Sequence, residues 1–223
     1  MSDMTDSSRT APPNPTYIYR LAHVDNLPTL LRRGALHAAN HTPPDDLPYR
    51  TIHNVSIQVA RHTRPVPCGP QGTMHDYVPF YFGYLSPMLF QLKTGRVTGY
   101  NEGQRPLIYL VTTVQTVHEA NLPFVFSDGH GIAAYTKWFD DLTHLDRVDW
   151  SMVYQRYWSD HPDDMDRQRR KQAEFLVYRS LPWALIRGVG VFDDVAGQCV
   201  EQTLEQFEPD LHKPVRVVQK WYY

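Results

Sequence analysis

Three polar side chains could do chemistry together, because each stands at the edge of an apolar, strand-like segment. They are Arg61, His130 and Glu174. Glu174 opens the apolar run E-F-L-V-Y, where burial of a carboxylate is costly unless a cation pairs with it or a reaction uses it. A carboxylate can stabilise positive charge that develops on a sugar carbon, and it can deprotonate an incoming nucleophile. The set therefore suits the transfer of a glycosyl group, provided that the three side chains meet in one cleft.

A plainer interpretation is structural. The basic residues 169–171 and Arg179 are close to Glu174 in sequence, so the carboxylate can belong to a surface ion pair. His130 can likewise be a core histidine with satisfied hydrogen bonds. Residue types and spacing alone favour this structural interpretation over the catalytic one.

Several common reaction classes have no support in the sequence. The chain contains no Walker loop, no G-x-G-x-x-G turn, no H-E-x-x-H pair and no G-x-S-x-G elbow. These absences argue against phosphoryl transfer by a P-loop, Rossmann-type redox chemistry and zinc-dependent hydrolysis.

Composition and charge narrow the class of protein further. The chain has 223 residues, 42% of them hydrophobic, which is enough to form one hydrophobic core. We expect a disordered leader at 1–15 and a single domain at 16–223. The net charge of −2 means that any contact with nucleic acid must be local. Cys68 and Cys199 lack the spacing of a metal site, and no apolar run reaches membrane-spanning length. We expect a cytoplasmic protein without a metal.

The elements that must position these side chains are short strands and helices in mixed order, typical of an α+β fold. The apolar patterns predict strands at 17–21, 107–117, 124–126, 174–178, 183–192 and 215–221, and helices at 27–33 and 195–207. Residues 51–60 fit a short strand or a helical turn, and residues 132–168 are predicted to be mainly helical. Turn-forming residues at 38–50 predict a loop that lies over another part of the molecule.

Residues 75–90, H-D-Y-V-P-F-Y-F-G-Y-L-S-P-M-L-F, are unusually rich in aromatic rings. One interpretation is a core strand at a sheet edge or bulge, because Pro79 and Pro87 cannot donate to a strand ladder. The other is a surface that stacks nucleobases. Alternation along a strand would place Tyr77 and Tyr81 on one face and Phe80 and Tyr84 on the other.

Five stretches of the chain resemble the DarT family, toxins of DarT–DarG toxin–antitoxin systems that ADP-ribosylate bases in single-stranded DNA. They are Y-I-Y-R-L-A-H-V-D-N-L (17–27), residues 75–90, L-P-F-V-F-S-D-G-H-G (122–131), K-Q-A-E-F-L-V-Y-R (171–179) and the terminal K-W-Y-Y. The resemblance implies an ADP-ribosyltransferase-like fold, a split mixed β-sheet with surrounding helices. It also implies NAD⁺ as co-substrate, no metal, single-stranded DNA as acceptor, a monomer, and a DarG-like macrodomain antitoxin as partner.

The resemblance assigns roles to individual residues. It implies that Glu174 holds the nicotinamide ribose and assists attack by the base, and that Arg61 contacts NAD⁺ and helps to remove the proton of the base. His130 would begin a target-recognising loop that ends at Glu174, and residues 45–63 would close over NAD⁺. The positions expected to contact NAD⁺ are Arg20, Leu21, Ala22, Thr29, His37 and Arg61. Those expected to contact DNA are His75, Tyr77, Tyr81, Tyr84 and Met88.

Two positions depart from the family pattern. Arg20 stands where the pattern has a histidine, and its guanidinium could contact phosphate instead. Tyr84 and Leu85 stand where the pattern has a Pro-Arg pair, so an arginine that would contact DNA is missing. We expect transfer that depends on the DNA sequence, with thymine as the target base and guanine as the second candidate. A single-stranded nucleic-acid-binding module without catalysis and a hydrolase of NAD⁺ remain alternatives.

Overall fold

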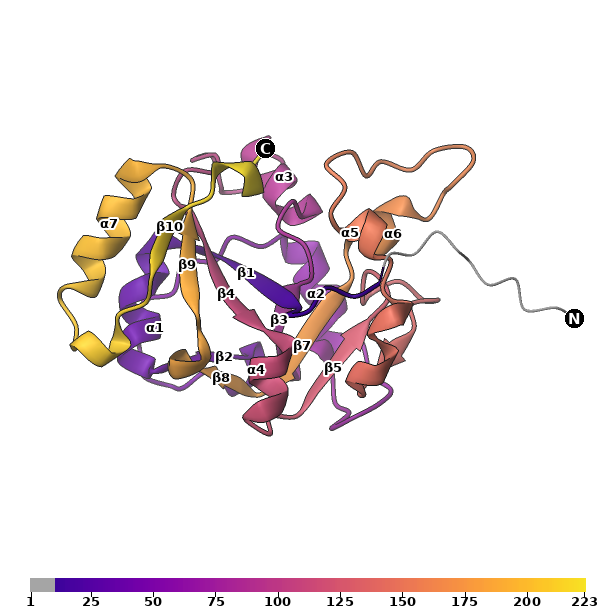
Figure 1. Cartoon of the computed structure of the whole chain (residues 1–223), viewed down its shortest axis with the longest axis horizontal. Coiled ribbons are helices and arrows are strands. Elements are labelled where there is room, and N and C mark those ends of the chain that lie inside the picture. The colour runs from indigo at the N-terminus through magenta and orange to yellow at the C-terminus, as the bar shows by residue number, and fades with distance from the viewer. Residues whose placement is uncertain (1–10) are drawn as a thin grey trace, which may run out of the picture.

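The computed structural model describes residues 11–223, so most of the leader expected at 1–15 lies outside the described residues. The strands of the main sheet are β1 (Tyr17–His23), β3 (Tyr77–Tyr81), β4 (Leu107–Thr113), β5 (Phe124–Ser127), β6 (Trp138–Phe139), β7 (Glu174–Tyr178), β9 (Gly188–Val191) and β10 (Val215–Val217). Their spatial order is β10-β9-β4-β1-β3-β7-β5-β6, and a second sheet pairs β2 (Ala35–His37) with β8 (Ser180–Pro182) (Figure 1). Only β9 and β10 run parallel, so the main sheet is mixed, as predicted.

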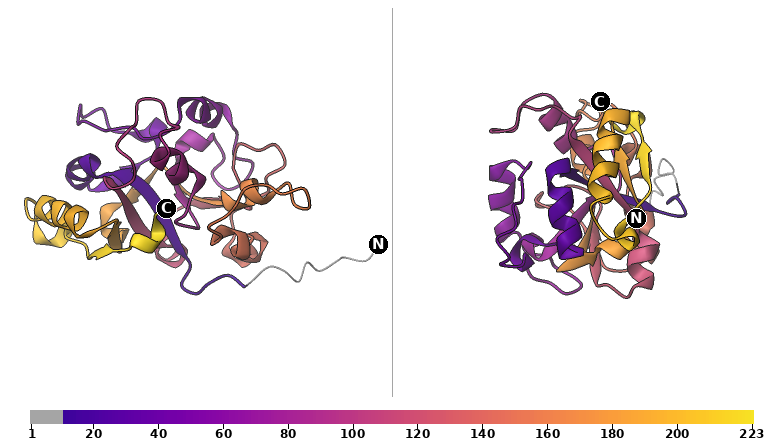
Figure 2. Two further views of the ribbon diagram at one scale, coloured as in Figure 1. Left: turned by 90° about the horizontal axis from the view of Figure 1, so that it is seen from above. Right: turned by 90° about the vertical axis from the view of Figure 1, so that its left-hand side faces the viewer.

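Seven α-helices flank these sheets in the described part of the chain. They are α1 (Leu27–Arg33), α2 (Val55–Thr63), α3 (Pro87–Lys93), α4 (Val114–Glu119), α5 (Trp150–Val153), α6 (Arg167–Lys171) and α7 (Asp194–Leu204). Helices α1 and α7 pack together beside β9 and β10, whereas α5 and α6 lie at the opposite end of the molecule (Figures 1 and 2). None of the helices in residues 11–223 is both long and apolar enough to cross a membrane.

The main sheet opens between β1 and β3. These neighbours share a single residue pair, Tyr19 with Tyr81, whereas β1 and β4 pair along seven residues. Pro79 explains part of the weak pairing between β1 and β3, because it has no N–H group to donate to a neighbouring strand. Its carbonyl oxygen accepts a hydrogen bond from the side chain of Arg20 at 3.0 Å instead. The split predicted for the sheet is therefore present between β1 and β3.

The two faces of the main sheet have different cores. One face carries a continuous apolar cluster that includes Ile18, Val78 and Phe175 and packs against α1, α4 and α7. The other face carries two separate clusters, one around Tyr109 beside α3 and one around Leu176. A gap therefore remains between those two clusters, on the side of the sheet where β1 and β3 separate.

The aromatic stretch at 75–90 is not an edge strand. Its strand, β3, lies in the interior of the sheet between β1 and β7, with Pro79 paired to Leu176. The prediction of an edge strand was wrong. Because β1 and β3 separate beside Pro79, no strand there requires an N–H group from Pro79, just as none would at a sheet edge. Pro87 begins α3, a position where its missing N–H costs nothing.

Other predicted elements are shorter than expected. Residues 132–168 contain β6, a 3₁₀ stretch at Leu142–Arg147, α5 and the start of α6, but are otherwise irregular, so the prediction of a mainly helical segment was wrong. Ion pairs hold this segment instead: Arg170 contacts the carboxylates of Asp149 and Asp164. The strands predicted at 107–117, 183–192 and 215–221 are confirmed only at 107–113, 188–191 and 215–217. At 51–60 the helical alternative is the correct one.

Candidate active site

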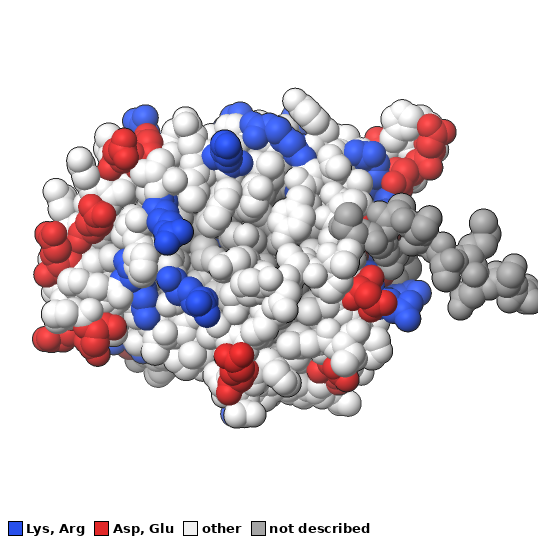
Figure 3. All heavy atoms as spheres, in the orientation of Figure 1, with Lys and Arg blue, Asp and Glu red and all other residues white. Residues whose placement is uncertain are grey.

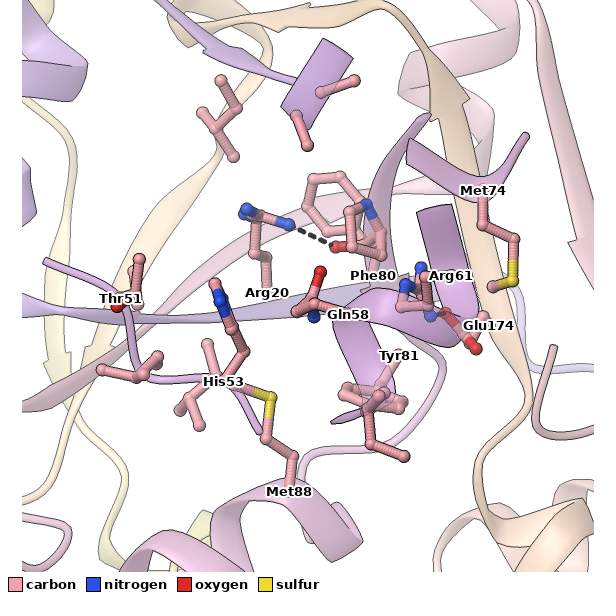
Figure 4. A pocket seen from close by; sticks show the side chains of 18 of the residues that line it. Arg20, Thr51, His53, Gln58, Arg61, Met74, Phe80, Tyr81, Met88 and Glu174 are labelled. Carbon is pink, nitrogen blue, oxygen red and sulfur yellow. Dashed lines mark hydrogen bonds and ion pairs between the residues drawn. The ribbon is translucent and has the colours of Figure 1, made fainter. Parts of the chain in front are cut away.

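Glu174 is the first residue of β7, and it is almost completely buried, with 2% of its surface exposed. Arg61, from the last turn of α2, donates through Nη1 to Glu174 Oε2 at 2.7 Å (Figure 4). The backbone N–H of Gly131 donates to the other carboxylate oxygen at 3.1 Å. Both oxygens are therefore satisfied, and the buried charge is compensated by a partner 113 residues away.

The basic residues next to Glu174 in sequence are used elsewhere. Arg169 pairs with Asp128 and Asp166, and the Lys171 ammonium donates to two backbone carbonyls near α5. Burial lowers the pKa of Lys171 to about 7. The interpretation of Glu174 as half of a surface ion pair is therefore wrong.

Arg61 retains a donor for a ligand. Its Nη2 atom is buried, yet among residues 11–223 it has no hydrogen-bond partner. A buried, unpaired guanidinium N–H is unfavourable unless a bound molecule or water accepts it. Because Nη1 is held by Glu174, the orientation of the guanidinium is fixed before any ligand arrives.

The same helix positions the turn that contains His130. Asn54 caps the start of α2 by accepting from the backbone N–H of Ser56, and the chain leaves the helix at Arg64. Arg64 then donates to the carbonyls of Gly131 at 3.2 Å and Ala133 at 2.9 Å. The end of α2, the turn after β5 and the start of β7 are thus fastened together, which brings Arg61, His130 and Glu174 to one wall of a cavity.

This cavity has a volume of about 480 Å³ and occupies the gap where β1 and β3 separate. Arg20 and Arg61 both project into it, with Gln58 drawn between them (Figure 4). Its size is that of a small-molecule site, and two guanidinium groups suit an anionic ligand. The residues present therefore fit a dinucleotide that carries a diphosphate.

The loop predicted to lie over another part of the molecule covers this cavity. The side-chain amide N–H of Asn26 donates to the Arg50 carbonyl oxygen at 2.8 Å, and the Asn26 amide oxygen accepts from the Arg50 backbone N–H at 2.6 Å. Thr29 donates to the Pro48 carbonyl at 2.7 Å. Residues 38–54 are thereby tied to the start of α1, and several of them line the cavity, among them Thr42 and Tyr49.

Four histidines line the cavity: His37, His53, His75 and His130. Burial lowers the pKa of each of them, and for His130 the nearby Arg61 adds to the effect while Glu174 opposes it. These imidazoles are therefore neutral at pH 7, so His130 can accept a proton.

We predict that the protein loses stability between pH 6.5 and pH 5.5. A histidine whose pKa is lowered by folding binds a proton more readily in the unfolded state, so acidification through this range favours unfolding. Carboxylates with ordinary or lowered pKa titrate below this range. The urea midpoint should fall between pH 6.5 and pH 5.5, and it should fall less in His130→Asn. An unchanged or higher midpoint at pH 5.5 would contradict the prediction.

The comparisons with known proteins decide the family. Residues 19–223 match the family model described as "ssDNA thymidine ADP-ribosyltransferase, DarT". The chain belongs to the DarT family. A DNA ADP-ribosyl transferase from Thermus sp. (strain 2.9) is 43% identical over 95% of this chain and 98% of its own length. A DNA ADP-ribosyl transferase from Escherichia coli O127:H6 is 33% identical over 98% of both chains.

Solved DarT structures have the same fold. The Thermus sp. 2.9 DarT in complex with ADP-ribosylated ssDNA superposes with a TM-score of 0.89 at 42% identity, covering 96% of this chain and 100% of that one. The complex of the same DarT with NAD⁺ gives a TM-score of 0.85 at 40% identity, with the same coverage. The expected ADP-ribosyltransferase-like fold, the reaction class and NAD⁺ as co-substrate are confirmed, so this DarT is an NAD-dependent DNA ADP-ribosyltransferase.

Among the positions that the DarT resemblance assigned to NAD⁺, all but one line the cavity. Arg20, Leu21, Ala22 and His37 do so, and the His37 Nε2 atom is buried without a partner among the described residues. Thr29 does not line it; it is 1% exposed and holds the covering loop through Pro48.

The positions assigned to DNA divide into two groups. His75, Tyr81 and Met88 line the cavity and keep part of their surface exposed. Tyr77 also borders it, but it is 1% exposed and its hydroxyl donates to the Gln71 carbonyl. Tyr84 lies outside the cavity and stacks on Trp221 at 5.3 Å. Tyr77 thus offers no ring face to a base, which corrects the expectation that it stacks, whereas the role of Tyr81 stays a prediction.

Several cavity residues were not named individually from the sequence, among them Gln58 and His53, which lie within the segment 45–63 expected to close over NAD⁺. Gln58 precedes Arg61 by three positions on α2, so both side chains point to the same side of the helix, and its amide oxygen contacts His75 at 3.1 Å. This spacing could have identified Gln58 once α2 was assigned as a helix. His53 lies on the covering loop, and no local pattern indicates its position.

Proposed function

We propose that this chain transfers ADP-ribose from NAD⁺ to thymine in single-stranded DNA. The observation that carries the proposal is the buried Arg61–Glu174 pair on the wall of the cavity, with Arg61 Nη2 left to donate to a ligand. The matching family model is described as an ssDNA thymidine ADP-ribosyltransferase, which supports thymine as the target base and single-stranded DNA as the acceptor.

In this proposal Glu174 supplies negative charge beside the ribose carbon from which nicotinamide leaves. Nicotinamide takes the electrons of the broken bond, and the base forms the new bond to the same carbon as it loses a proton. Neutral His130, on the same wall as Glu174, accepts that proton. Arg61 has no lone pair to act as a base, so it stabilises the negative charge that the base acquires.

Arg20 contacts the diphosphate of NAD⁺ in this proposal. One of its nitrogens is held by the Pro79 carbonyl, which leaves the rest of the guanidinium directed into the cavity (Figure 4). We predict that Arg20→Ala raises the KM for NAD⁺ by about tenfold or more, because a hydrogen bond to a charged group contributes roughly 1.5 to 3 kcal/mol. Steady-state kinetics with Arg216→Ala, an exposed arginine on β10, provide the control. An unchanged KM in Arg20→Ala would refute the assignment.

The target base can be tested with four single-stranded oligonucleotides of one mixed sequence, each with one base type replaced throughout. We expect labelling by NAD⁺ to be lost when thymine is removed, and the label to lie on thymine in each of the other oligonucleotides that is modified. Loss of labelling on removal of guanine alone would identify guanine as the acceptor. A duplex of the parent sequence should be labelled far less, since pairing hides the base edge that is attacked.

The remaining parts of the proposal concern the cellular setting. The DarT resemblance implies a toxin that acts as a monomer in the cytoplasm and is restrained by a DarG-like macrodomain antitoxin. Expression of the chain alone should stop growth of a bacterial host, and co-expression of a macrodomain that removes ADP-ribose from DNA should restore it. Growth without restraint would contradict the toxin role.

A further inference from the structure

Tyr135 is an exposed aromatic residue held in a fixed orientation. It has 66% of its surface exposed, yet the guanidinium of Arg169 lies 5.0 Å from its ring centroid. The Tyr135 hydroxyl also donates to Asp166 at 3.2 Å. A tyrosine that served only to cover the core would be buried, and one that served only for solubility would need neither contact.

The turn beneath Tyr135 is equally well fixed. Thr136 Oγ1 donates to the His130 carbonyl at 2.7 Å, and the backbone N–H of Ala133 donates to the same carbonyl at 3.0 Å. Arg64 holds the turn from the α2 side through Gly131 and Ala133. The ring of Tyr135 is therefore ordered before any ligand binds, so that stacking on it costs little conformational entropy.

Tyr135 is connected to the cavity through its neighbours. His130, at the start of its turn, lines the cavity, and so does Gln168, the residue before Arg169. The neighbouring Gly131 N–H contacts Glu174 directly. This connection makes Tyr135 a candidate contact for a nucleotide next to the target base.

Charge around Tyr135 is only partly balanced. Arg169 forms ion pairs with both nearby acids, Asp128 and Asp166, so one guanidinium offsets two carboxylates. The face of the molecule drawn in Figure 3 shows separate groups of Lys and Arg rather than a basic stripe. Stacking therefore has to supply affinity that bulk charge does not.

We propose that Tyr135 is a preformed stacking platform for a nucleobase that flanks the target base. This inference rests on the proposed transfer to single-stranded DNA. Arg169 covers one face of the ring and strengthens the platform by a cation–π contact, while the other face accepts a base. Tyr135 is a DNA-binding residue in this account and takes no part in breaking the bond to nicotinamide.

The test measures KM for a single-stranded oligonucleotide, KM for NAD⁺ and kcat in Tyr135→Ala and Tyr135→Phe. Tyr135→Ala should raise the KM for DNA by about tenfold and leave kcat and the KM for NAD⁺ unchanged, because only a flanking contact is lost. Tyr135→Phe retains the ring and should keep a KM for DNA close to that of the wild type, although it loses the bond to Asp166.

The matched control is Tyr157→Ala, because Tyr157 is even more exposed, at 81%, and lies in the loop between α5 and α6. Its KM for DNA should match the wild type. The inference is overturned if Tyr135→Ala leaves that KM unchanged, if Tyr157→Ala raises it equally, or if Tyr135→Phe is as impaired as Tyr135→Ala. Wild-type protein that labels no DNA would overturn the proposed function as well.

Discussion

Glu174→Gln should lower the rate of ADP-ribosyl transfer by about 10³-fold while the protein remains folded. The amide matches the carboxylate in size but carries no negative charge to stabilise the ribose as nicotinamide leaves. Glu174→Ala should be at least as inactive. Initial rates of labelling of a single-stranded oligonucleotide at saturating NAD⁺ provide the measurement.

Stability separates this catalytic role from a structural one. In Glu174→Gln the single amide oxygen can accept from Arg61 or from the Gly131 N–H but not fully from both, so the variant should lose about 1 to 3 kcal/mol. A domain of this size should then melt only some degrees lower. Glu119→Gln, at the exposed end of α4, should match the wild type in rate and Tm. A folded Glu174→Gln variant with wild-type turnover would remove Glu174 from the mechanism.

Arg61→Lys should be impaired by about 10²-fold, even though the positive charge is kept. The guanidinium does two things at once, because Nη1 holds Glu174 while Nη2 remains for the ligand. A lysine ammonium is a point charge on a flexible side chain. It lacks the planar guanidinium that can direct one N–H to Glu174 and another to the ligand at the same time. Single-turnover rates with bound NAD⁺ and single-stranded DNA should show the loss in the chemical step.

Two comparisons make the Arg61 prediction specific. Arg61→Ala should be at least as slow as Arg61→Lys, and it should also lose stability, since Glu174 would be left as a buried charge without a cation. Arg216→Lys, on the exposed edge strand β10, should retain full activity. Equal turnover of Arg61→Lys and the wild type would show that only charge matters at this position.

Local sequence was sufficient to place Glu174 but not to find its partner. The apolar run after Glu174 predicted a strand that begins there, and β7 begins at that residue. The pairing with Arg61 depends on how β3, β7 and α2 pack, which no local pattern contains. Composition alone therefore favoured the basic residues at 169–171, and only the resemblance to a family singled out Arg61.

The errors in the fold prediction have a common origin in long-range contacts. Pro79 indicated an edge strand because it has no N–H group to donate to a neighbouring strand. In the structure the sheet opens beside β1 at this point, so no such hydrogen bond is needed. The apolar spacing at 132–168 indicated helices, but ion pairs of Arg169 and Arg170 hold the segment in an irregular path. Tyr77 belonged to an aromatic-rich strand, but its side chain is sealed by packing against Tyr178.

The most direct test of the whole account is a mass measurement on both products of one reaction. Wild-type protein is incubated with NAD⁺ and a thymine-containing single-stranded oligonucleotide, and with NAD⁺ alone. We predict that the oligonucleotide gains the mass of one ADP-ribosyl group in step with release of nicotinamide, and that Glu174→Gln produces neither. Release of nicotinamide and free ADP-ribose at the same rate with and without DNA, and an oligonucleotide of unchanged mass, would contradict the account.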